Sequence, residues 1–76
     1  MTDAPIQYHV ALFKSVSHVM YAERILKEAH VPHKIIPVPR TISSDCGVCI
    51  RFLPEHGELV ENTLTGKVEA YEVRAL

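Results

Sequence analysis

Apolar and polar residues alternate along the first part of the chain and then change to a helical period. Between Ile6 and Phe13, apolar side chains occupy every second position, which predicts a strand. From about Ser17 to Ala29 they recur every three or four residues, behind a serine, either Ser15 or Ser17, that can cap a helix. The pattern therefore predicts a strand followed by a helix.

Prolines divide the middle of the chain. Pro32 prevents the helix from continuing, and residues 33–38 return to an extended pattern. Because Pro37 and Pro39 remove two backbone donors, we expect this second strand at an edge of the sheet. A third strand is predicted over Gly47–Leu53.

The third strand has two different faces, and a helix and a strand follow it. Successive side chains of a strand point to opposite sides, so Cys49 and Arg51 lie on the face away from Val48, Ile50 and Phe52. A second helix is predicted from Pro54 to just before Gly66, and a last strand over residues 67–74.

This order of elements predicts an α+β fold. The economical packing is a ferredoxin-like βαββαβ two-layer sandwich with a four-stranded antiparallel sheet. A right-handed crossover would make the first two strands parallel, with the third strand between them. The chain has 76 residues, which is one small domain over residues 1–76, and we expect residues 1–5 to be flexible.

The predicted topology brings three distant segments to one end of the domain. These are the end of the first strand with Lys14 and Ser15, the start of the first helix, and the loop from Pro37 to Cys46. We expect any chemistry to be located there.

Charge and hydropathy exclude several classes of function. Eight Lys and Arg against nine Asp and Glu give a formal net charge of −1, so no global field favours nucleic acid or a membrane surface. No apolar stretch approaches the roughly 20 residues of a membrane span. The opening Met1–Pro5 also lacks the cationic region of an export signal, and we therefore expect a cytoplasmic protein.

The most informative motif is a Cys-x-x-Cys pair formed by Cys46 and Cys49. This spacing is compatible with a reversible disulfide, with half of a zinc site, or with two small residues filling a tight turn. A zinc site needs four ligands, and the histidines at 9, 18, 30, 33 and 56 have no ligand spacing. We expect no metal site and no cofactor, and we expect most of these histidines on the solvated surface.

A single reactive thiol is a further alternative, and Cys46 is the candidate. Polar residues Ser43 and Ser44 precede it, and Gly47 leaves room for another molecule to approach the backbone. Lys14 and the positive end of the first helix would favour thiolate over thiol, whereas Asp45 acts in the opposite direction.

The combination of motifs resembles a known family. The Pro37-Val38-Pro39-Arg40 segment, followed by Ile42-Ser43-Ser44 and Cys46-Gly47, is similar to the selenium/sulfur carrier-like proteins, and the resemblance extends over about Val10–Phe52. It implies a carrier cysteine at Cys46, surrounded by Arg40, Ser43, Ser44 and Gly47. Two positions depart from the family, which usually has glycine in place of His30 and often lacks a cysteine at Cys49.

The leading hypothesis is a carrier rather than an enzyme. Cys46 would accept sulfur or selenium from a donor protein as a persulfide or perselenide and pass it to an acceptor protein, with Lys14, Ser15 and Arg40 beside it. Cys49 could then release the cargo by attacking Cys46. The alternatives are a thiol-disulfide redox protein using both cysteines and a non-catalytic interaction module. A homodimer is compatible with the small core.

Overall fold

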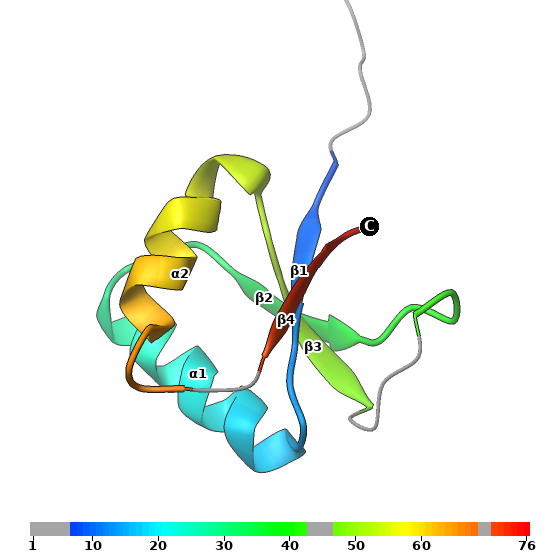
Figure 1. The fold of residues 1–76 in the computed structure, drawn as a ribbon, viewed down its shortest axis with the longest axis horizontal. Coiled ribbons are helices and arrows are strands. Elements are labelled where there is room, and N and C mark those ends of the chain that lie inside the picture. Colours follow the sequence, from blue (N-terminus) through cyan, green and yellow to red (C-terminus); the bar gives the residue numbers. More distant parts are fainter. Residues whose placement is uncertain (1–6, 43–46, 69–70) are drawn as a thin grey trace, which may run out of the picture.

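A computed structural model describes residues 7–42, 47–68 and 71–76 (Figure 1). The expected flexibility of residues 1–5 and the beginning of the first strand at Ile6 lie outside the described residues. The elements follow the predicted order, with a short 3-10 turn, η1, before the second helix. They are β1 His9–Leu12, α1 Val16–Glu28, β2 Lys34–Pro37, β3 Val48–Phe52, η1 Pro54–His56, α2 Gly57–Leu64 and β4 Glu72–Ala75.

The four strands form one antiparallel sheet in the order β2-β3-β1-β4. Strand β3 lies between β2 and β1, and β2 lies at an edge, as the sequence predicts. Because β3 is antiparallel to both neighbours, β1 and β2 run in the same direction. The fold is therefore α+β with two helices and a four-stranded antiparallel sheet.

Both ends of α1 have a local cause in the sequence. Ser15 is the N-cap residue, and its side-chain oxygen accepts a hydrogen bond from the backbone N–H of His18 at 3.3 Å. At the other end, His30 has a φ of 59°, and the backbone N–H groups of His30 and Val31 donate to the carbonyls of Lys27 and Leu26. These two bonds form a Schellman motif, in which glycine is the usual residue at the position of His30.

The two faces of the sheet are covered differently. Both helices lie on one side, whereas the segment after β2 extends on the other side (Figure 1). The helix-covered face of the sheet contributes Ala11, Ile50 and Phe52 to the main core. The predicted alternation along β3 is confirmed, because Cys49 belongs to a separate cluster on the opposite face. The main core also contains Phe13, Val19, Ala22, Ile25, Leu26, Val31, Val60, Leu64 and Val68.

The cluster on the opposite face is small and consists of Val10, Leu12 and Cys49. All three are buried although no helix packs there. Three half-buried residues from β2 and the segment after it, Ile36, Val38 and Ile42, pack against them. We call this surface the helix-free face.

The C-terminal third of the chain departs from the predicted boundaries. The second helix ends before Gly66, as predicted, but the last strand begins at Glu72 rather than at residue 67. The backbone N–H groups of Lys67 and Val68 both donate to the carbonyl of Leu64, so these residues continue a turn after α2. Val68 is buried in the main core, and its apolar character therefore serves helix packing rather than a strand.

Neither α1 nor α2, within the described residues, has the length and apolar character needed to cross a bilayer.

Candidate functional site

The described part of the predicted site lies at one end of the sheet. Pro37, the last residue of β2, is the register partner of Val48, the first residue of β3. Since β1 runs parallel to β2, its end and the following Lys14 and Ser15 are directed toward the same end. The sheet thus brings the start of α1 and both ends of the loop between β2 and β3 to one side of the domain.

Hydrogen bonds hold the two described ends of this loop. The backbone N–H of Val38 donates to the carbonyl of Gly47 at 3.1 Å, which extends the β2–β3 ladder by one step. The N–H of Ile42 donates to the carbonyl of Pro39 at 3.0 Å, which forms a turn around Arg40. Val38 and Ile42 both pack on the helix-free face, so the loop is fixed to the sheet by apolar contacts as well.

The leading candidate residue and three of its neighbours lie outside the described residues. These are Cys46 with Ser43, Ser44 and Asp45, and their predicted roles stay predictions. Gly47 is exposed, and a Cβ added to it would meet no atom within 4 Å. Among the described residues, no side chain crowds this position, and the role of Gly47 in admitting another molecule stays a prediction.

The charged side chains that the structure describes at this end are positive. Lys14 and Arg40 are exposed, and among residues 7–42, 47–68 and 71–76 neither forms an ion pair. The first turn of α1 contains no acidic residue, and its N-terminus adds the positive end of the helix dipole. Ser15 is already engaged as the N-cap, and its hydroxyl also lies 2.7 Å from His18 Nδ1. A negatively charged sulfur species at this end would be stabilised by these groups.

Cys49 lies under the loop rather than beside it. Its exposed fraction is 0 %, and it belongs to the cluster with Val10 and Leu12 on the helix-free face, against which Val38 and Ile42 pack. A reagent or a second thiol can therefore reach its sulfur only when the surrounding structure opens locally. The Cys-x-x-Cys motif therefore combines one residue next to an open glycine with one buried residue.

One histidine is an exception to the expectation that most of the histidines are solvated. His33 is not solvated, because its side chain is only 8 % exposed and its Nε2 lies 2.7 Å from Glu23 Oε2. Its other ring nitrogen, Nδ1, lies 2.7 Å from the backbone oxygen of Val31. His33 thus connects the middle of α1 to the segment that leads into β2.

This connection could not be found from spacing, because ten residues separate Glu23 from His33 and only the turn after α1 brings them together. Among the residues that the structure describes, no group of three His, Cys, Asp or Glu side chains could hold a metal ion.

The comparisons with known proteins give one family. A family model described as "Putative Se/S carrier protein-like" matches residues 8–73. The match confirms the resemblance noted in the sequence, and it extends beyond the quoted motifs into β4. A search of curated proteins and a search of solved structures found no significant match.

Proposed function

This chain belongs to the Se/S carrier protein-like family, and we propose that it carries sulfur or selenium on Cys46 between a donor and an acceptor protein. The observation that carries the proposal is the family match over residues 8–73, which includes both the Pro37–Arg40 segment and the Cys46-Gly47 pair. The open backbone at Gly47 and the positive charge at this end of the sheet support it.

Loading is a transfer of a neutral sulfur atom between two thiolates. The Cys46 thiolate attacks the terminal sulfur of a persulfide on the donor, the sulfur–sulfur bond of the donor breaks, and the donor leaves as a thiolate. Cys46 then carries the persulfide, and no net oxidation of the protein pair has occurred. Lys14, Arg40 and the N-terminus of α1 stabilise the negative charge, and Ser15 fixes that N-terminus. Ser43 and Ser44 complete the surroundings of the cargo.

Two routes can release the cargo. An acceptor thiolate can attack the terminal sulfur, which restores the Cys46 thiolate. Alternatively the Cys49 thiolate attacks Cys46 Sγ, hydrosulfide leaves, and a Cys46–Cys49 disulfide remains, which a dithiol reductant must open before the next cycle. Because Cys49 is fully buried, the second route requires a local opening around it, and we propose direct transfer as the main route.

A patch of exposed apolar residues supports contact with donor and acceptor proteins. Val16, Met20 and Tyr21 are 55 %, 53 % and 50 % exposed, and they occupy the first half of α1, directly after Lys14 and Ser15. Exposed apolar side chains beside a reactive group are typical of surfaces that dock other proteins. The homodimer predicted from the sequence stays a prediction.

Two further assignments accompany the carrier function. We propose the ferredoxin-like class for the fold, supported by the strand order β2-β3-β1-β4 and by two helices on the same face of the sheet. We propose a cytoplasmic location, because a carrier thiol needs a compartment that keeps thiols reduced.

The decisive experiment measures transfer by intact-protein mass spectrometry. The protein is incubated with a cysteine desulfurase and cysteine, and we expect a mass increase of one sulfur atom that dithiothreitol removes. The adduct should disappear in Cys46→Ser and persist in Cys49→Ala, which is the matched control because it removes the other cysteine. An adduct that forms equally in Cys46→Ser, or none in the unaltered protein, would contradict the proposal.

The redox alternative predicts a different product from the same two sulfurs. Equilibration with glutathione buffers would give an internal disulfide with a defined potential. A disulfide that forms readily in the absence of any sulfur donor would favour that alternative over the carrier function.

A further inference from the structure

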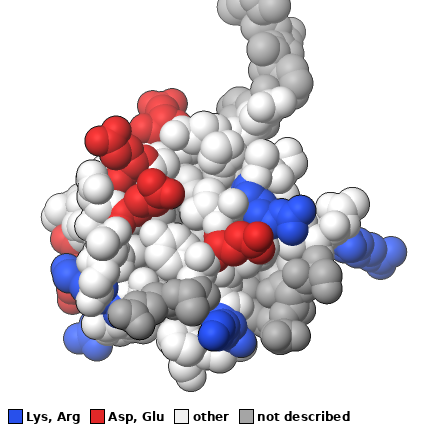
Figure 2. All heavy atoms as spheres, in the orientation of Figure 1, with Lys and Arg blue, Asp and Glu red and all other residues white. Residues whose placement is uncertain are grey.

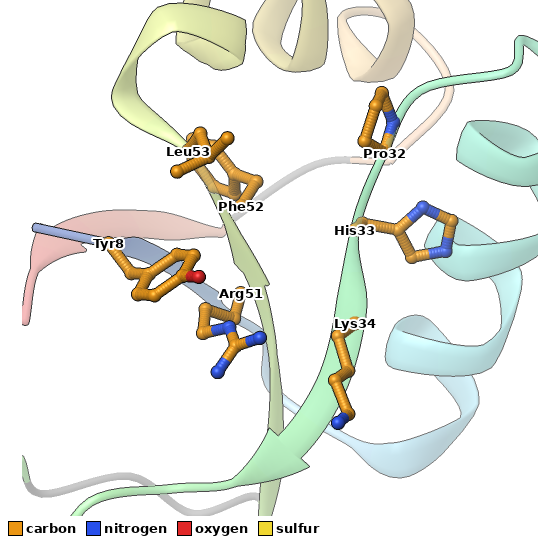
Figure 3. A pocket seen from close by; sticks show the side chains of 7 residues that line it. All are labelled: Tyr8, Pro32, His33, Lys34, Arg51, Phe52 and Leu53. Carbon is orange, nitrogen blue, oxygen red and sulfur yellow. The ribbon is translucent and has the colours of Figure 1, made fainter. Parts of the chain in front are cut away.

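A second candidate site lies at the opposite end of the sheet from the loop that contains Cys46. A cavity of about 260 Å³ opens where β2 begins and β3 ends (Figure 3). Tyr8, Pro32, Phe52 and Leu53 give it apolar walls, and Lys34 and Arg51 are its charged residues. Lys34 and Pro37 are the two ends of β2, so roughly 10 Å of strand separates this cavity from the loop.

The two cations of the cavity are direct neighbours across two strands. Lys34 is the register partner of Arg51, and like charges at such positions repel each other. Among the described residues, no carboxylate forms an ion pair with either side chain. Arg74 extends the row, because Val10 pairs with Arg51 on one side and with Arg74 on the other. An anion held between the first two cations would remove this repulsion.

Arg51 is held in an orientation that suits an oxyanion. Its guanidinium carbon lies 4.1 Å from the centre of the Tyr8 ring, so the flat group stacks on the aromatic face. Figure 3 shows the two side chains lying against each other, next to Leu53 and Phe52. Stacking leaves the N–H groups at the edge of the guanidinium available, and these match the spacing of phosphate or carboxylate oxygens.

His33 also lines the cavity, but it does not add a third ligand. Its ring is turned toward α1 (Figure 3), where both nitrogens are occupied by Glu23 and Val31. The cavity therefore offers two positive side chains, which match the charge of a dianion.

One group of exposed acidic side chains lies on the helical side of the molecule. Glu55, Glu58 and Glu61 are exposed on α2 and the turn before it, where Figure 2 shows several acidic side chains together. The net charge of the chain is −1, so attraction of an anion has to come from local cations.

We propose that this cavity binds a small phosphate monoester. The dianionic phosphate lies between Lys34 and Arg51, and its aromatic or apolar ester group lies against Tyr8, Pro32 and Leu53. A cavity of about 260 Å³ is slightly smaller than the roughly 300–1,000 Å³ of most small-molecule sites, which restricts the ligand to a compact molecule. The site does not involve Cys46 and does not depend on the carrier function.

Amide NMR titrations with phenyl phosphate and, separately, with inorganic phosphate test this proposal. We expect saturable shifts centred on Lys34, Arg51 and Leu53, with phenyl phosphate binding more tightly than inorganic phosphate. Arg51→Gln should weaken phenyl phosphate binding at least about tenfold, the effect of losing one charge-assisted contact. Lys34→Gln should weaken it as well, and because Lys34 is exposed, this variant keeps the test valid if Arg51→Gln does not fold.

Two controls separate the site from general charge effects and from the carrier function. Lys27→Gln removes an exposed cation on α1 outside the cavity and should leave binding unchanged. Cys46→Ser should also bind phenyl phosphate normally, although it cannot carry sulfur. Equal affinity in Lys34→Gln and Lys27→Gln, shifts that never saturate, or equal affinity for inorganic phosphate and phenyl phosphate would overturn the proposal.

Discussion

Helices bury one face of the sheet, and a loop buries part of the other. We expect the first face to determine the stability of the domain and the second face to determine the reactivity of Cys49. On one face, two amphipathic helices supply a continuous core that includes Leu26, Ile50 and Leu64. On the helix-free face, a turn in the loop after β2 covers Val10, Leu12 and Cys49 through Val38 and Ile42. A helix packed along its length resists local opening, whereas a loop held by two apolar side chains opens at lower cost. Cys49 lies on the face that opens more easily.

The largest expected effect is a loss of global stability when the helix-covered core is reduced. Ile50 has an exposed fraction of 0 %, and Ile50→Ala should lower the free energy of unfolding by about 2–5 kcal/mol. This is a large share of the stability of so small a domain. Urea denaturation measures it, with Val16→Ala at an exposed position as the control. A cost of less than about 1 kcal/mol for Ile50→Ala would mean that the helices do not dominate the stability.

A change on the helix-free face should separate reactivity from stability. Ile42→Ala removes half-buried contacts above Cys49 and should cost only about 1 kcal/mol of global stability. It should nevertheless raise the rate at which Cys49 reacts with a thiol reagent at least about tenfold, because the cover opens more often. The rate is measured in the Cys46→Ser background, which leaves Cys49 as the one cysteine of the chain. If Ile42→Ala did not change the rate at which Cys49 reacts, or if Ile50→Ala raised this rate far more, the proposed difference between the two faces would be wrong.

The helix-covered face could largely be predicted from the sequence. The alternation at Val48, Ile50 and Phe52 and the helical period of α1 are local patterns, and the structure follows both. The sequence predicts a strand over residues 67–74 that would include Val68, because an isolated apolar residue does not show whether it belongs to a helix or to a strand. Its place under α2 depends on the turn after Leu64, which only tertiary packing fixes.

The helix-free face and the sites could be predicted only in part. The alternation along β3 predicts that Cys49 and Arg51 point away from the helices, but it does not predict that Ile42 packs against the cluster that contains Cys49. The pairing of Lys34 with Arg51 depends on register between strands joined by a long loop, which no local pattern specifies. The family motifs predict a site in the loop that contains Cys46, but they do not predict the cavity at the opposite end of the sheet.

A substitution that stabilises the end of α1 should leave the reactivity of Cys49 on the helix-free face unchanged. His30 adopts a φ of 59° at the end of α1, a conformation that costs a non-glycine residue about 1 kcal/mol. His30→Gly should therefore raise the free energy of unfolding by up to about 1 kcal/mol, measured by urea denaturation. The reactivity of Cys49 should stay the same, since local opening of the loop does not involve this turn. His30→Ala, which keeps the strain, is the control, and an equal gain in both variants would refute the backbone explanation.

The smallest expected effect is a pH dependence on the helix-covered side. Burial, and then the negative charge of Glu61, raise the pKa of Tyr71 above its ordinary value of 10.0. The folded state therefore disfavours the phenolate, and the unfolded chain ionises first as the pH rises. Below about pH 10 Tyr71 is neutral in both states, so its contribution is constant there; above that pH it is lost progressively through the raised pKa.

Tyr71→Phe should consequently match the unaltered protein below pH 10 and lose less stability above it, as measured by urea denaturation at alkaline pH. The ring of Tyr71 stacks on Phe13 with centroids 5.6 Å apart, and phenylalanine preserves this contact. Glu61→Gln should recover part of the difference, because it removes the second cause of the raised pKa. The free energy of unfolding of Tyr71→Phe and of the unaltered protein could instead fall equally with pH above 10. Tyr71 would then be as well solvated in the folded state as in the unfolded one, and the prediction would be wrong.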